Sequence, residues 1–102
     1  MNDGLKKRYR MKIRQVLASH PGVERAVLFG SRATGNYRPG SDVDLALVGN
    51  SLTQSHLGAI GAGMEATTVP QMVDLVLWSS IDNRVLADHI RNCGVEFYVR
   101  RW

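Results

Sequence analysis

Hydrophobic positions near the start of the chain recur at the spacing of a helix. They predict a helix over residues 5–19, whose apolar face holds Leu5, Tyr9, Ile13, Val16 and Leu17. This helix stops at His20-Pro21-Gly22, because proline lacks a backbone N–H and fixes its own φ. The continuous apolar run that follows, Ala26-Val27-Leu28-Phe29, is typical of a strand buried on both faces, and Gly30 ends it.

The middle of the chain is predicted to contain a connection, a strand and a weaker helical pattern. Residues 31–41 include two glycines and a proline, which indicates a connection with one helical turn at its start. A second strand is expected over residues 42–48. Residues 52–66 have Leu57, Ile60 and Met64 at helical spacing. The glycines at positions 58, 61 and 63 each cost roughly 1 kcal/mol against alanine in a helix interior, so this helix remains an open question.

The last third of the chain carries two more strand patterns and one more helix. The run over residues 72–78 predicts a third strand. Ser80 is the expected N-cap of a helix that runs to Cys93 and stops at Gly94. Val95, Phe97 and Val99 then alternate as a short last strand.

Length and composition indicate a soluble single domain over residues 1–102. A content of 44% hydrophobic and 22% charged residues is ordinary for a globular protein. The single cysteine, Cys93, cannot form an internal disulfide, and the N-terminal residues lack the apolar stretch of a secretory signal. The longest apolar runs have four residues, far fewer than a membrane span needs. We therefore expect a cytoplasmic protein that does not enter a membrane.

The net charge of +4 is concentrated near the N-terminus. Six basic residues lie within nine positions: Lys6, Lys7, Arg8, Arg10, Lys12 and Arg14. They fall mostly on the side of the first predicted helix that is opposite its apolar face. Two interpretations remain open, a solvated helix face or a patch that meets RNA, DNA or an acidic protein surface.

Two carboxylates, Asp42 and Asp44, stand at the start of the second predicted strand. Residues two apart on a strand point to the same face, with Cα atoms ~6.5 to 7 Å apart. The apolar neighbours Val43 and Leu45 turn to the other face and fix the register. Two ionised groups this close repel unless a cation joins them, and Mg²⁺ prefers carboxylate oxygens together with substrate phosphates. The pair therefore predicts a metal site.

Gly30, Ser31 and Arg32 follow the first predicted strand, and ten residues separate Ser31 from Asp42. A glycine lets the backbone approach a phosphate closely, and a helical turn after it offers N–H groups. The Ser31 hydroxyl adds one contact, and the guanidinium of Arg32 has a fork suited to phosphate oxygens. A triphosphate held here, beside a metal, predicts phosphoryl transfer.

Asp74 is the expected third carboxylate, because it lies in a strand pattern with apolar residues on both sides. An unpaired charge there would be costly. Two metal ions about 3.5 to 4 Å apart, bridged by shared carboxylates, activate an attacking hydroxyl and steady the leaving pyrophosphate. The competing interpretation makes residues 30–42 a polar turn, in which Ser31 caps a short helix and Asp42 and Asp44 are solvated.

These residues resemble the signature of the nucleotidyltransferase superfamily related to DNA polymerase β, which is Gly-Ser, a short spacer and Asp-x-Asp. The similarity is closest to the small members called minimal nucleotidyltransferases (MNT), and it extends over the context LFGSRA, the strand with Asp74 and the ending from Ile90 to Tyr98. It implies a nucleotidyltransferase fold of the α+β class, with a small mixed β-sheet flanked by helices. By resemblance, Asp42, Asp44 and Asp74 are catalytic metal ligands, and Gly30 with Ser31 contacts the nucleotide. The glycine-rich segment 58–63 departs from other members, which look more charged and helical there.

The resemblance also implies a partner, because 102 residues leave no room for an acceptor-binding domain. Minimal members resemble the antitoxins of two-gene modules in which a helical HEPN-type ribonuclease is the toxin. The first-ranked hypothesis is Mg²⁺-dependent transfer of AMP from ATP to a tyrosine hydroxyl of such a partner. Two alternatives are an antitoxin that neutralises its partner by binding alone, and one subunit of a split nucleotidyltransferase for small antibiotic-like molecules.

Overall fold

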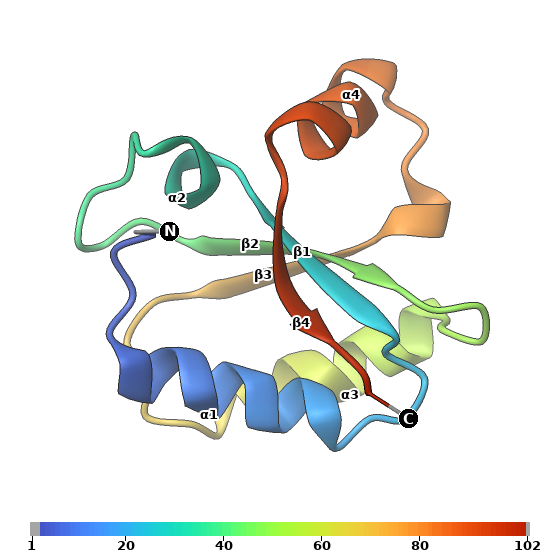
Figure 1. Ribbon diagram of the computed structural model, residues 1–102. Helices are drawn as coiled ribbons and strands as arrows, with labels where there is room; N and C mark the ends of the chain where they lie inside the picture. Colours follow the sequence, from blue (N-terminus) through green and yellow to red (C-terminus); the bar gives the residue numbers. More distant parts are fainter. Residues whose placement is uncertain (1–2, 102) are drawn as a thin grey trace.

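The computed structural model describes residues 3–101 as a four-stranded sheet with helices on both faces (Figure 1). In chain order the elements are α1 (Lys7–Ala18), β1 (Arg25–Phe29), α2 (Ser31–Thr34), β2 (Val43–Val48), α3 (Gln54–Glu65), β3 (Val73–Leu77), a short 3₁₀ turn η1 (Trp78–Ser80), α4 (Arg84–Cys93) and β4 (Val95–Val99). This arrangement confirms the predicted α+β fold with a small mixed sheet. No helix within residues 3–101 is long and apolar enough to cross a membrane.

The strand order is β3-β2-β1-β4, and β1 pairs antiparallel with both β2 and β4. Strands β2 and β3 run parallel, which the intervening helix α3 makes possible by carrying the chain back across the sheet. The parallel register places Asp44 opposite Asp74, and the antiparallel register places Asp44 opposite Phe29. Asp44 is therefore central in the sheet, with one neighbour on each side.

The main core lies between the sheet and the pair α1 and α3, which Figure 1 shows together below the sheet. The β2 residues Val43, Leu45 and Leu47 point to this side, where they meet Ile13 of α1 and Ile60 of α3. A smaller apolar cluster on the other face joins Phe29, Ala46 and Ile90 under α4. Because strand side chains alternate, Asp44 shares this second face with Ala46.

Helix α3 settles the question raised by its glycines. A capping box closes its N-terminus, in which His56 Nδ1 accepts from the Thr53 N–H at 2.9 Å. Ile60 and Met64 are buried against the sheet. A Cβ atom at Gly63 would lie 3.0 Å from Cγ1 of Val16, so glycine here allows α3 to pack close to α1. The packing of one apolar face outweighs the low helix propensity of the segment.

The predicted N-cap of α4 is wrong. Ser80 belongs to the 3₁₀ turn η1, and the N-cap is Asn83, three residues later, so the helix begins at Arg84. The side-chain oxygen of Asn83 accepts from the Leu86 N–H at 3.1 Å, which satisfies one of the free N–H groups of the first turn. Helix α4 still ends at Cys93, and β4 follows as predicted.

Candidate active site

Gly30 forms a sharp turn between β1 and α2. Its backbone has φ of 74° and ψ of −155°, a conformation that glycine adopts and L side chains rarely do. A Cβ atom at this position would also collide with the Oδ2 atom of Asp44. The turn that starts α2 and the central carboxylate of the sheet are therefore in direct contact, as the sequence argument requires.

The three predicted aspartates lie near one another on the face of the sheet that carries α4. Asp42 directly precedes β2 and is exposed, Asp44 is partly buried, and Asp74 is exposed on the edge strand β3. Burial raises the pKa of the Asp44 carboxyl, and the charges of Asp74 and Asp42 raise it further, while His89 acts in the opposite direction. Of the three predicted aspartates, Asp44 is thus the one with the least access to water.

The donor set of the carboxylates fits a hard divalent cation. All three side chains offer oxygen ligands, and the mutual repulsion expressed in the raised pKa of Asp44 is what a bound cation relieves. No group of three His, Cys, Asp or Glu side chains in residues 3–101 is already arranged as a set of metal ligands.

Arg32, which is predicted to contact phosphate, lies in the interior, where its guanidinium contacts backbone carbonyl oxygens. The residue is only 1% exposed. Its guanidinium donates to the carbonyl oxygens of Ser41 at 3.0 and 3.1 Å, Pro39 at 3.1 Å and Asp3 at 2.9 Å, with a longer contact to Arg38. These hydrogen bonds all go to backbone oxygens. Arg32 therefore fixes the loop before Asp42.

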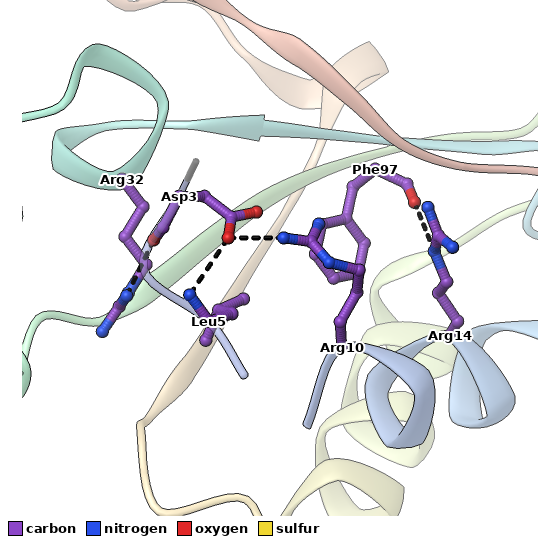
Figure 2. A network of polar contacts seen from close by, with 6 residues as sticks. All are labelled: Asp3, Leu5, Arg10, Arg14, Arg32 and Phe97. Atoms are coloured by element: carbon purple, nitrogen blue, oxygen red, sulfur yellow. Dashed lines mark hydrogen bonds and ion pairs between the residues drawn. The ribbon is translucent and has the colours of Figure 1, made fainter. Parts of the chain in front are cut away.

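The same network reaches the N-terminal segment (Figure 2). Asp3 is buried, and its Oδ1 atom accepts from the Leu5 N–H at 3.0 Å and from the guanidinium of Arg10. Figure 2 shows the carbonyl group of Asp3 turned to Arg32 and its carboxylate turned to Arg10. Residues before α1 are thereby connected to the loop that ends at Asp42.

His89 is a residue of the site that sequence reasoning missed. Its Nε2 atom accepts a hydrogen bond from the Gly30 N–H at 3.0 Å. Its ring stands edge-on to that of Phe29, with centroids 6.2 Å apart and an interplanar angle of 77°. Fifty-nine positions separate His89 from Gly30, so no local spacing rule connects the two residues.

Comparison with known proteins agrees with this geometry. The family model described as "Polymerase beta, Nucleotidyltransferase" matches residues 11–101. A search of curated proteins gives no significant match.

Three solved structures illustrate the likeness in fold. A chain of a toxin–antitoxin complex with AMP-PNP has a TM-score of 0.72 and 24% identity, covering 90% of this chain and 74% of that chain. A chain of the complex of a tri-AMPylated Shewanella oneidensis HEPN toxin with an MNT antitoxin has a TM-score of 0.69 and 21% identity, covering 94% and 74%. A Sulfolobus solfataricus putative nucleotidyltransferase has a TM-score of 0.56 and 22% identity, covering 89% and 77%.

The family model spans nine-tenths of the chain and includes both the Gly30-Ser31 turn and the three aspartates. This chain belongs to the polymerase β nucleotidyltransferase family.

Proposed function

We propose that this protein transfers AMP from ATP to the hydroxyl group of a tyrosine on a HEPN-type toxin and thereby acts as the antitoxin of that toxin. The observation that carries the proposal is the contact between the Gly30 turn and Asp44, with Asp74 opposite Asp44 in the sheet register. A phosphate-binding turn next to clustered carboxylates is an arrangement for phosphoryl transfer. One solved structure with a chain of the same fold is a complex of an MNT antitoxin with a tri-AMPylated HEPN toxin, which supports a protein as the acceptor.

The predicted site residues divide into two groups in the proposed reaction, and Asp74 has a second role. Gly30 and Ser31 would bind the phosphates of ATP, and Asp42, Asp44 and Asp74 would hold Mg²⁺. The cation supplies charge neutralisation for the triphosphate when it is bound. The acceptor oxygen forms a bond to the α-phosphorus, and the bond from that phosphorus to pyrophosphate breaks. Asp74 would also take the hydroxyl proton, because it is exposed on the edge strand β3.

The test is co-expression with the product of the neighbouring gene, followed by mass spectrometry of that product after incubation with ATP and Mg²⁺. We expect added AMP units on a tyrosine of the partner, and none with Asp42→Asn. Arg38→Lys, a change at an exposed loop residue close in sequence, is the matched control and should transfer AMP as wild type does. An inhibited but unmodified partner would favour neutralisation by binding alone, and absence of any complex would contradict the antitoxin function.

A further inference from the structure

The N–H group of Gly30 lies at the end of β1, where the sheet no longer provides a partner for it. Strand β4 begins at Val95, which pairs with Leu28, two residues before Gly30. The chain before Val95 is the last turn of α4 and Gly94, whose own N–H bonds to the Ile90 carbonyl at 2.9 Å. His89 replaces the missing strand residue, with its Nε2 atom 3.0 Å from the Gly30 nitrogen.

Packing fixes the position of the His89 ring. The next residue, Ile90, is 4% exposed and belongs to the apolar cluster with Phe29 and Ala46, which anchors this turn of α4 on the sheet. The edge-on contact with the Phe29 ring sets the orientation of the imidazole.

The conformation of Gly30 needs such an external restraint. Glycine adopts its left-handed conformation readily, but it adopts many other conformations as well, so the residue alone does not fix the direction of the turn. The hydrogen bond that the Gly30 N–H donates to His89 holds the peptide before Gly30 in place, and this peptide sets where Ser31 and α2 begin. On its other side, the same glycine is in contact with the carboxylate of Asp44.

We propose that His89 is a positioning residue for nucleotide binding, which acts by holding the Gly30 turn in the conformation that receives the phosphates next to Asp44. The proposal rests on the nucleotide-binding part of the proposed function and is independent of the acceptor. His89 touches neither phosphate nor metal in this role. It acts through the backbone of Gly30, so its effect should appear in nucleotide affinity more than in the chemical step.

Two substitutions separate the hydrogen bond from the packing. His89→Phe keeps a ring against Phe29 and removes the acceptor, whereas His89→Gln provides a side-chain oxygen that can accept from the Gly30 N–H. His20→Phe is the matched control, because His20 lies before β1, at the opposite end of that strand from Gly30. The measurement is calorimetric binding of AMP-PNP with Mg²⁺ by the full chain, with thermal melts of each variant.

We expect His89→Phe to weaken AMP-PNP binding about tenfold, which corresponds to ~1.4 kcal/mol. His89→Gln should recover most of the affinity, and His20→Phe should bind as wild type does. In steady-state transfer, His89→Phe should raise the KM for ATP with a smaller change in kcat. Equal affinity of His89→Phe and wild type would overturn the inference. So would an equal loss in both His89 variants, because that result would assign the effect to packing.

The outcome for wild type distinguishes this inference from the proposed function. If wild type binds AMP-PNP with the expected dependence on His89 but leaves the partner unmodified, AMP transfer to the partner is wrong and the role of His89 stands. If wild type binds no nucleotide, both are wrong.

Discussion

Arg32 donates two hydrogen bonds to the carbonyl oxygen of Ser41, from Nε at 3.1 Å and from Nη2 at 3.0 Å. Ser41 immediately precedes Asp42, and Arg32 lies in the first turn of α2, directly after the Gly30-Ser31 turn. One buried guanidinium therefore connects the two halves of the signature across the ten-residue spacer. The spacer is held mainly through its backbone carbonyls, and the Ser41 hydroxyl adds a contact by accepting from the Arg38 N–H at 2.8 Å.

Arg32→Lys should destabilise the protein although it conserves the charge. A single ammonium group cannot match the planar fork that serves the carbonyls of Asp3, Pro39 and Ser41, and unpaired buried groups are costly. We expect a loss of about 3 kcal/mol in the free energy of unfolding, measured as a lower urea midpoint at unchanged m-value. Arg38→Lys, in the exposed part of the same loop, should change stability by less than about 0.5 kcal/mol.

A different result at Arg32 would support the phosphate contact that the sequence predicts. In that case Arg32→Lys would leave the urea midpoint unchanged and raise the KM for ATP. Measuring both quantities on the same protein distinguishes the two roles.

Asp44→Asn should raise the thermal stability of the protein in EDTA at neutral pH. The pKa of Asp44 is raised in the folded state by burial and by the charges of Asp74 and Asp42, so the folded state binds this proton more tightly than the unfolded state does. The favourable contribution of protonation is present below the unfolded pKa and is lost as pH rises through the folded pKa. Asparagine has no such ionisation, and the Tm of Asp44→Asn should exceed that of wild type by a few degrees at pH 7.

The pH and metal dependence provide the controls for this prediction. The difference in Tm should disappear below about pH 4, where Asp44 is protonated in both states. Adding Mg²⁺ with ATP should stabilise wild type in a saturable way and leave Asp44→Asn almost unchanged. A variant that melts below wild type at pH 7 in EDTA would show that the ionised carboxylate does not strain the fold.

Asp44→Ala should remove AMP transfer almost entirely, whereas Ser31→Ala should reduce it modestly. The strand is held by Val43 and Leu45, both fully buried, so the fold survives the loss of the carboxylate. Loss of one hydroxyl contact costs about 1 kcal/mol, while loss of a metal ligand removes charge stabilisation and reduces the rate by a factor of about 10³. Single-turnover kinetics with the partner measure both, and a more damaging change at Ser31 would reverse the assigned roles.

The sequence was most informative about features that depend on a single strand, such as which side chains share one face. The alternation of Asp42, Val43, Asp44 and Leu45 predicts a carboxylate face because strand geometry has a fixed period of two. The parallel register that sets Asp44 beside Asp74 depends on how α3 crosses the sheet, which no strand pattern contains. The α4 cap was misplaced for a related reason: Ser80 and Asn83 are both good caps, and the turn η1 decides between them.

Arg32 and His89 show a second limit of sequence reasoning. The partners of Arg32 lie at residues 3 and 38–41, and that of His89 lies 59 positions away, so tertiary folding alone defines their roles. An arginine after Gly-Ser has the correct chemistry for phosphate, and burial is what redirects it to carbonyls. The charge of a side chain thus indicates what it can bind, and its burial determines what it does bind.

The basic residues of the N-terminal segment divide into two classes in the structure. Arg10 pairs with the buried Asp3, Lys12 donates to Thr68, and Arg14 donates to the carbonyl of Phe97 at 2.9 Å. Lys6 and Lys7 are exposed and have no hydrogen bond or ion pair through their side chains within residues 3–101. The fold thus uses part of the basic run, and the remaining lysines face water.

Neutralising Lys6 and Lys7 together to glutamine should slow association with an acidic partner and leave the stability of this chain unchanged. Exposed charge accelerates encounter more than it tightens a complex, so wild-type association should fall as salt rises from about 50 to about 500 mM, and the double variant should depend less on salt. Arg10→Gln is the contrasting control, because it leaves the buried carboxylate of Asp3 without its ion pair and should lower the Tm. Stopped-flow association rates test the difference. Rates that are identical for wild type and the double variant at every salt concentration would identify this face as simply solvated.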